Sequence, residues 1–286
     1  MEHKLSAFLS KYHHLLTDRE SRYLSLVCSC YNGYPPLKDL WLLMDHAWIQ
    51  SQSESDDSRL SLSHFYSHPV WLLNGLFSAF DYHSKLDRDK LFNLIANRAP
   101  RRVLDFGGGF GNLARLSASY LPNTLVQVLE PHPHPIALEL CKSYSNIEFV
   151  TSIEAPYDVV VASDVFEHLL DPVDAAYHCA MSLADGGIII SANCFSPVIL
   201  CHLPQNFHME FSWSRILESM GLLLVDSNSR HSIHMKAMPL SLALARKEEA
   251  LSRLVYPYLR APISLFPRGK KKLGTLLYSL LRKGLF

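Results

Sequence analysis

The sequence has no C-x-x-C pair among its six cysteines, which are Cys28, Cys30, Cys141, Cys179, Cys194 and Cys201. This absence argues against a zinc knuckle and against a thioredoxin-like redox site. Cys28 and Cys30 are too close together to suggest a metal pair. Scattered thiols fit a reducing compartment, so we expect a cytoplasmic protein.

The formal net charge is zero, and we expect neither a membrane span nor a signal peptide. Lys+Arg and Asp+Glu both total 27, so there is no chain-wide basic surface and we expect no nucleic-acid partner. No apolar stretch approaches the roughly 20 residues that cross a bilayer. The first residues, Met-Glu-His-Lys-Leu, lack the basic and apolar regions of a signal peptide.

The N-terminal third reads as helical. With 286 residues, 48% of them hydrophobic, the chain has room for one large domain with additions, or for two domains. Apolar residues recur at helical spacing over 1–50, and aromatic residues over 64–97 predict two more helices, the second over 87–97. The Ser-rich stretch 51–58 predicts a loop. We therefore expect a helical cap or substrate-binding region over 1–98.

From Arg101 onward, short β-rich runs alternate with helical runs. This alternation predicts a parallel sheet with helices on both faces, a Rossmann-like doubly wound α/β domain over 99–249. The expected strands are 103–106, 125–129, 147–150, 158–162, 188–192, 222–226 and 240–245. The expected helices are 111–120, 135–144, 172–183 and 212–220.

Residues 250–286 form a basic tail with eight Lys/Arg and no Asp/Glu. Its leucines recur at i, i+3, i+4, i+7 and i+8, which predicts an amphipathic helix; they are Leu273, Leu276, Leu277, Leu280 and Leu281. Such a helix can lie on an anionic membrane as a peripheral contact. Packing of residues 268–286 on the catalytic domain, or across a dimer, is the alternative.

The most informative stretch runs from Val103 to Ala114, where a strand enters a glycine-rich turn and a helix leaves it. Gly107, Gly109 and Gly111 permit positive φ and close approach of a ligand. Glu130 follows Gly111 by 19 residues, at the end of the next strand, where an acid can bind both ribose hydroxyls of a nucleoside.

Two nucleoside cofactors fit this spacing. Residues 109–114, Gly-Phe-Gly-Asn-Leu-Ala, also satisfy the dinucleotide pattern G-x-G-x-x-A. Asp105 favours S-adenosylmethionine, because this cofactor carries an ammonium and a sulfonium and no phosphate. A carboxylate at the mouth of the turn attracts those cations and would repel a diphosphate.

Several ordered motifs in residues 101–247 resemble those of the class I methyltransferases. Residues 103–111 look like the family's D-x-G-x-G-x-G loop, and Glu130 matches its ribose-binding acid. Residues 157–172, with Glu167-His168-Leu169, resemble the family's fourth strand and the segment after it. Residues 183–190 resemble its turn into the fifth strand, with Asp185 in place of the usual proline.

This resemblance implies S-adenosylmethionine as cofactor and the sheet order 3-2-1-4-5-7-6, with the seventh strand antiparallel. It assigns cofactor contacts to Asp105, the three glycines of the loop and Glu130, and to Asp164 and Val165 at the edge of the fourth strand. The family's adenine-binding Asp after the third strand is absent. Residues 151–154 are Thr-Ser-Ile-Glu, so we place Ser152 or Ile153 near adenine.

Four histidines are candidates for acceptor activation, because a hydroxyl acceptor benefits from a general base, most often His. The resemblance favours His168, whose other interpretation is a brace for the helix that begins near Pro172. His202 and His208 flank the loop after the fifth strand, where acceptor contacts are common. His83 in the cap is a further candidate, whereas His132 and His134 read as surface-loop residues.

We expect no metal site, because no H-x-x-x-H or paired-acid spacing marks one. Asp164 with Glu167 could meet a divalent ion, but helix capping and cofactor contact explain them more simply. The favoured function is methyl transfer to a hydroxyl or amine of a small molecule such as a sugar, quinol or secondary metabolite. The alternatives are methylation of RNA or protein, and a non-catalytic scaffold that binds S-adenosylmethionine.

Overall fold

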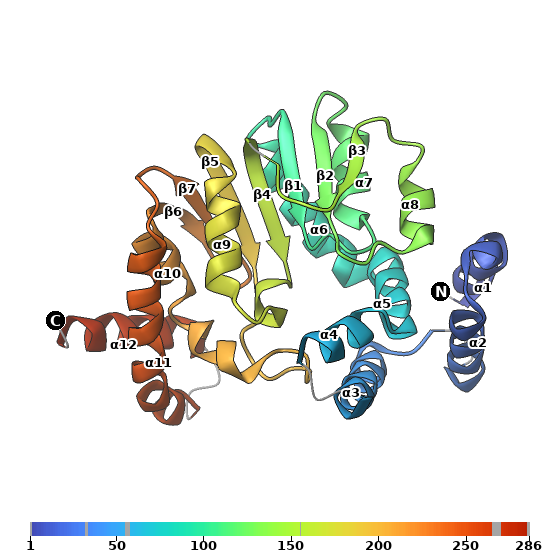
Figure 1. Cartoon of the computed structure of the whole chain (residues 1–286), viewed down its shortest axis with the longest axis horizontal. Coiled ribbons are helices and arrows are strands. Elements are labelled where there is room, and N and C mark those ends of the chain that lie inside the picture. The colour runs from blue at the N-terminus through green and yellow to red at the C-terminus, as the bar shows by residue number, and fades with distance from the viewer. Residues whose placement is uncertain (1, 32–33, 55–57, 155, 265–269, 285–286) are drawn as a thin grey trace. The chain divides into compact units, whose positions relative to one another are not determined.

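The strands form a seven-stranded sheet with the order β3-β2-β1-β4-β5-β7-β6 (Figure 1). The computed structural model describes residues 2–31, 34–54, 58–154, 156–264 and 270–284. The strands are β1 (Arg102–Phe106), β2 (Leu125–Leu129), β3 (Ile147–Val150), β4 (Tyr157–Ser163), β5 (Leu183–Ala192), β6 (Leu222–Ser227) and β7 (Ser232–Lys236). β7 runs antiparallel to β5 and β6, so the expected sheet order and the antiparallel strand are confirmed.

The inner strands are apolar because both of their faces are covered. Val159, Val160 and Val161 of β4 are each 0% exposed. Val159 pairs with Val103 of β1 on one side and with Ile188 of β5 on the other, both in parallel register. β-Branched residues with no polar alternation are typical of a parallel strand between two layers of helices.

The expected strand over 240–245 is wrong. The seventh strand is Ser232–Lys236, and residues 242–245 begin helix α11 (Leu242–Ser264). His234, which is 0% exposed, interrupts the apolar run of β7 and hides it from a search for hydrophobic strands. At the start of α11, Ala245 is fully buried while Leu244 is 52% exposed, as in a helix with one buried face.

The N-terminal region is helical, but its breaks differ from those expected. Its helices are α1 (Glu2–Tyr12), η1 (His13–Leu15), α2 (Asp18–Tyr31), α3 (Leu37–Glu54), α4 (Ser58–Tyr66), α5 (Pro69–Phe80) and α6 (Tyr82–Ala96). Residues 51–54 belong to α3 rather than to a loop, and the Ser51 hydroxyl donates to the Trp48 carbonyl. Residues 55–57 of the expected loop lie outside the described residues.

Residues 64–97 contain parts of three helices rather than two, because two caps divide them. His68 accepts a hydrogen bond from the Val70 N–H and begins α5, whose first residue is Pro69. Asp81 accepts from the Ser84 N–H at 2.8 Å and begins α6. Polar N-caps and proline at the first helical position are the ordinary signals for a helix start.

Two compact units divide the contacts of the chain. The first comprises residues 1–100, 107–151 and 199–201, and the second comprises 101–106, 152–198 and 202–286. In the first unit, Phe110 of the glycine turn joins the buried core of the N-terminal helices. A Cβ at Gly75 of α5 would lie 2.7 Å from Cδ2 of Phe110, so the absent side chain permits this close packing. The unit also holds α7 (Asn112–Tyr120) and α8 (Pro135–Cys141).

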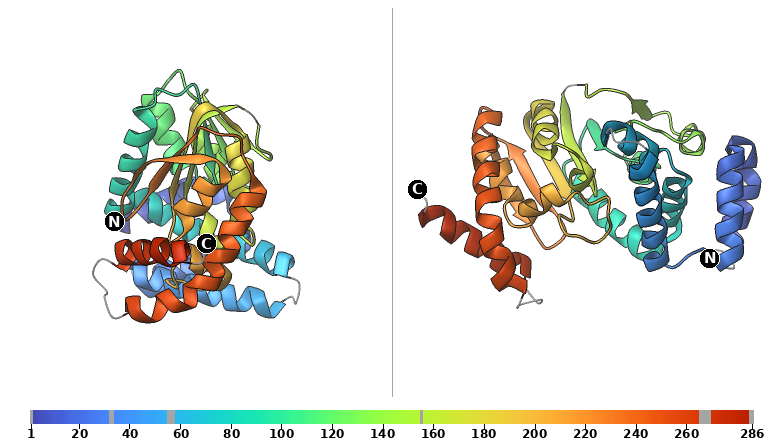
Figure 2. Two further views of the ribbon diagram at one scale, coloured as in Figure 1. Left: turned by 90° about the vertical axis from the view of Figure 1, so that its left-hand side faces the viewer. Right: turned by 60° about the horizontal axis from the view of Figure 1, so that its bottom comes forward.

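The second unit holds β1 and β4–β7 with the helices that follow them. These are η2 (Phe166–His168), α9 (Pro172–Met181), η3 (Pro204–Glu210), α10 (Trp213–Met220), α11 and α12 (Lys270–Gly284). Helix α12 packs against α11 (Figure 2). Tyr278 is 1% exposed and donates to Glu248 at 2.7 Å, and Arg282 Nε donates to the same carboxylate at 2.9 Å.

Some leucine side chains of α12 pack against α11, and others are exposed to solvent. Leu277 packs against the core of Leu251, Val255 and Tyr278, whereas Leu276 and Leu280 are more than half exposed. Among the described residues, no helix is long and apolar enough to cross a bilayer.

Candidate functional site

The glycine turn adopts the conformation that its sequence predicts. Gly107, Gly109 and Gly111 have φ of 69°, 52° and 65°, in the left-handed region that favours glycine. The Gly107 N–H donates to the Leu129 carbonyl at 2.8 Å, and Gly111 is the N-cap residue of α7. The turn therefore leads directly into a helix N-terminus, a location that binds polar and anionic groups.

Glu130 lies beside this turn and holds it. Its Oε2 accepts from the Gly109 N–H at 3.0 Å, and its Oε1 accepts from the His132 N–H at 3.1 Å. A Cβ placed on Gly109 would meet no atom within 4 Å, so the turn has an open side at this residue. An open cradle beside a carboxylate fits a nucleoside whose ribose bonds to the acid, as the sequence predicts.

The other predicted cofactor residues belong to the second unit. Asp105, near the end of β1, is 4% exposed and pairs in register with Val161. Asp164 follows β4 with φ of 53°, which is uncommon outside glycine and is found at functional sites. Val165 is the N-cap residue of η2. Ser152 is exposed in the segment after β3. The roles of these four residues remain predictions.

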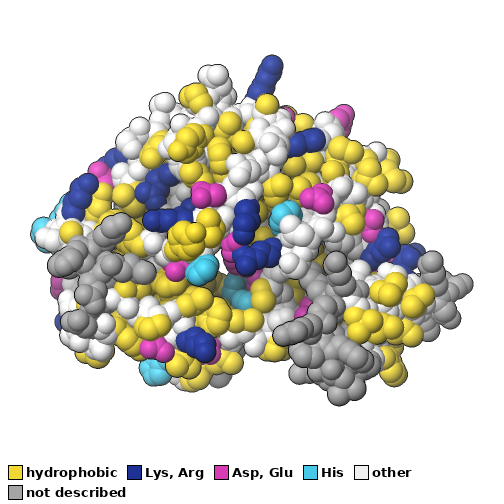
Figure 3. Space-filling view, turned by 180° about the vertical axis from the view of Figure 1, so that it is seen from behind, with side chains coloured by type: hydrophobic (Ala, Val, Ile, Leu, Met, Phe, Trp, Pro, Cys, Tyr) yellow, Lys and Arg dark blue, Asp and Glu magenta, His cyan; other side chains and the backbone are white. Residues whose placement is uncertain are grey.

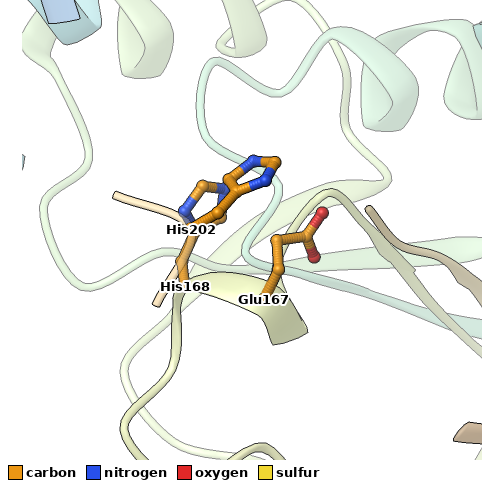
Figure 4. Close-up of side chains that lie close together, drawn as sticks. All are labelled: Glu167, His168 and His202. Atoms are coloured by element: carbon orange, nitrogen blue, oxygen red, sulfur yellow. The ribbon is translucent and has the colours of Figure 1, made fainter. Parts of the chain in front are cut away.

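Glu167, His168 and His202 lie together (Figure 4). Each offers one ligand or hydrogen-bonding atom, and these atoms all lie within 4.8 Å of one another. The imidazole rings of His168 and His202 contact edge to face, with centroids 4.9 Å apart. Glu167 and His168 follow β4 and His202 follows β5, which are neighbouring parallel strands, so all three come from the carboxyl edge of the sheet.

The backbone fixes the polar atoms of this cluster. His202 Nδ1 lies 2.8 Å from the Ser196 carbonyl, which can only accept, so Nδ1 carries a proton. Glu167 Oε1 accepts from the Cys194 N–H at 2.7 Å. Sequence reasoning named both histidines, and it considered Glu167 as a capping residue or, with Asp164, near a divalent ion, but it did not bring Glu167 together with His202. The signal for it was the position of all three after adjacent parallel strands.

The remaining candidate histidines lie elsewhere. His208 is 5% exposed, and its Nδ1 is 2.8 Å from the Ser252 hydroxyl of α11. Burial lowers the pKa of His208 to about 4. His83 is exposed near the start of α6. His134 is an N-cap rather than a surface-loop residue: it caps α8, and its Nε2 lies 2.9 Å from Glu20 of α2.

Comparison with known proteins identifies the family to which this chain belongs. A family model described as "Methyltransferase domain" matches residues 80–227, which is more than half of the chain. No curated protein sequence matches the chain. The fold and this match define the class: a Rossmann-like class I methyltransferase. The chain belongs to the methyltransferase-domain family, and S-adenosylmethionine is its cofactor.

Solved structures similar to this chain have low sequence identity. Human N-acetylserotonin methyltransferase in complex with S-adenosylmethionine is 13% identical, with a TM-score of 0.50, over 70% of this chain and 67% of that one. An O-methyltransferase family protein from Burkholderia thailandensis is 13% identical, with a TM-score of 0.45, and the match spans 60% of each chain. The N-methyltransferase NodS from Bradyrhizobium japonicum is 14% identical, with a TM-score of 0.45, over 68% of this chain and 98% of that one. At these identities the likeness concerns the fold alone.

Proposed function

We propose that the chain transfers the methyl group of S-adenosylmethionine to a hydroxyl, or to an amine, of a small molecule. The glycine turn and Glu130 bind the cofactor ribose, while Asp105 attracts its ammonium. Asp164 and Val165 contact the cofactor from the edge of β4, and Ser152 lies near adenine. The open side of the turn at Gly109 supports the cofactor placement, because a side chain there would occupy the space.

The cluster of Glu167, His168 and His202 is the observation that carries the acceptor half of this proposal. In methyl transfer, an acceptor lone pair forms a bond to the methyl carbon while the carbon–sulfur bond breaks and its electron pair remains on sulfur. A hydroxyl must also lose its proton. The imidazoles of His168 and His202 and the carboxylate of Glu167 are suited to orient and ionise such an acceptor.

His208 fits this role less well than the cluster does. It lies outside the cluster of Glu167, His168 and His202, and its Nδ1 is bound to the Ser252 hydroxyl of α11. Its pKa of about 4 makes it a weak base near neutral pH. We therefore assign acceptor activation to His168 and His202 and a packing role to His208.

The distribution of charge supports a small acceptor over RNA. Lysine, arginine and acidic side chains are interspersed on the face shown in Figure 3, in keeping with the equal totals of 27 basic and 27 acidic residues. RNA binding usually needs a basic surface that tracks the phosphate backbone.

The test is turnover with a panel of phenols, sugars, quinols and amines, measured as formation of S-adenosylhomocysteine and of the methylated product by mass spectrometry. We expect one of these classes to be methylated by the wild type. His202→Gln should lower kcat at least tenfold, the lower end of what a general base contributes. His208→Gln should retain more activity than His202→Gln. Equal losses in two folded variants would contradict the assignment.

A further inference from the structure

The Glu167–His168–His202 cluster has the composition of a metal centre. Two imidazoles and one carboxylate are a common ligand set for a catalytic divalent ion, with further positions open to water or substrate. Glu167 and His168 extend from η2 and His202 extends from the neighbouring segment (Figure 4), and their ligand atoms lie within 4.8 Å of one another. Metal–ligand bonds of about 2.0–2.2 Å place the ligand atoms of a tetrahedral site roughly 3.3–3.6 Å apart, so side-chain rotations must bring these three atoms closer when the ion binds.

The outer hydrogen bonds match those of metal ligands. A metal-bound histidine usually donates its other ring N–H to a carbonyl or carboxylate, which fixes its tautomer. His202 does so through Nδ1 and the Ser196 carbonyl at 2.8 Å, which leaves Nε2 as the ring atom for the metal. Glu167 accepts from the Cys194 N–H at 2.7 Å, so one carboxylate oxygen is anchored and the group is oriented.

The segments that carry these side chains are tied together by the backbone. The Leu203 N–H donates to the Glu167 carbonyl at 3.1 Å, which joins the residue after His202 to η2. Asn206 Nδ2 donates to the Leu169 carbonyl at 2.8 Å and closes the same connection from η3. The backbone segments that carry the three ligands are therefore held together before any ion binds, which reduces the entropy cost of binding.

Burial gives a physical reason for a cation here. Glu167 is 1% exposed and His202 is 7% exposed. A carboxylate that is removed from water is costly unless positive charge compensates it, and a divalent ion supplies that charge. Two neutral imidazoles favour a first-row transition ion over Mg²⁺ or Ca²⁺, which prefer ligand sets made of oxygen.

We propose that Glu167, His168 and His202 bind one divalent transition-metal ion, such as Zn²⁺, whose open coordination position takes the acceptor oxygen. This catalytic role rests on the proposed methyl transfer, whereas the metal site itself does not. The bound hydroxyl ionises and its proton passes to water. The oxygen lone pair then forms the bond to the methyl carbon, and the electron pair of the broken carbon–sulfur bond stays on sulfur. In this arrangement the metal ion would ionise the acceptor in place of His202 acting as a general base, and His202→Gln would lower turnover through loss of the ion.

The test uses the full chain, freed of metal with a chelator and titrated with Zn²⁺ or Co²⁺ alone. We expect one ion per chain, with visible absorption bands for Co²⁺ in a site of low coordination number. Glu167→Gln and His202→Gln should each weaken binding 10-fold or more. The matched control is His178→Gln in α9, because His178 has a side chain that is 63% exposed and lies outside the cluster. This variant should bind like the wild type.

A measurement on the wild type guards against variants that do not fold. X-ray absorption of the Zn²⁺-loaded chain should show scattering from two imidazoles and a carboxylate. A shell of oxygen ligands alone, or no stoichiometric uptake of Zn²⁺ or Co²⁺, would overturn the site. Metal binding with no methylation of any small molecule would instead sink the proposed function and leave the site. Full turnover after metal removal would overturn the catalytic role.

Discussion

Replacement of Glu130 probes the cofactor site most sharply. The carboxylate accepts from the Gly109 N–H at 3.0 Å and from the His132 N–H at 3.1 Å, so it both orients the turn and presents oxygens to a ribose. Glu130→Ala removes charge-assisted hydrogen bonds to the ribose hydroxyls, worth about 1.5–3 kcal/mol. At roughly 1.4 kcal/mol for each tenfold change, S-adenosylmethionine should bind about 10- to 150-fold more weakly. Glu130→Gln, which keeps the shape, should fall between Ala and wild type.

Isothermal titration calorimetry with S-adenosylmethionine and S-adenosylhomocysteine measures this loss directly. Glu139→Gln is a matched control, because Glu139 is an acid of the neighbouring α8 that pairs with Lys142 at the surface. It should bind the cofactor like the wild type. If folded Glu130→Ala retained wild-type affinity for both nucleosides, the assignment of Glu130 to the ribose would be refuted.

Three further predictions follow from other parts of the chain. Gly109→Ala should weaken cofactor binding more than Gly186→Ala does, because both glycines have positive φ and open space at Cβ but only Gly109 lies in the cofactor turn; equal affinities by calorimetry would contradict this. Acid should destabilise the protein through His234: burial lowers its pKa to about 4, so between pH 6.5 and 4 the unfolded chain binds a proton that the folded chain does not. Roughly 2 kcal/mol of the free energy of unfolding should be lost through this residue from pH 7 to 5. His234→Leu should reduce that loss, as measured by urea unfolding at both pH values. An unchanged pH dependence in this variant would exclude His234 as the source of the loss. Finally, we propose that the exposed leucines of α12 contact anionic membranes. The double variant Leu276→Ser/Leu280→Ser should co-sediment less with phosphatidylserine vesicles at low salt. Wild-type protein that does not co-sediment with these vesicles would contradict the proposal.

The catalytic fold could be predicted because its signals are local. The alternation of apolar runs with helical stretches, the glycine turn and Glu130 each depend on residues close together in the chain. The β7 strand could not be found in this way, because the burial of His234 depends on its neighbours in β5 and β6. A search for apolar runs selected residues 240–245 instead, and residues 242–245 begin α11.

The acceptor cluster shows the same limit. His168 and His202 could be nominated singly, one from a motif and one from its loop, but their contact depends on the pairing of β4 with β5. The sequence suggests that Glu167 caps or braces a helix. In the structure its carboxylate lies within 4.8 Å of ring nitrogens of both histidines. Which side chains of α12 are buried also depends on packing that the sequence does not show. Tyr278 is bound to Glu248, whereas Leu276 is exposed.

The most direct test of the central claim follows the methyl group itself. The wild-type protein, given S-adenosylmethionine labelled on the methyl carbon and a cell extract, is separated into molecules below about 1 kDa, RNA and protein. The proposed function predicts label in the small-molecule fraction, with the signal reduced at least tenfold in His202→Gln. Label confined to RNA or to protein would contradict the acceptor class. Cofactor binding with no label in any fraction would contradict catalysis and favour a scaffold.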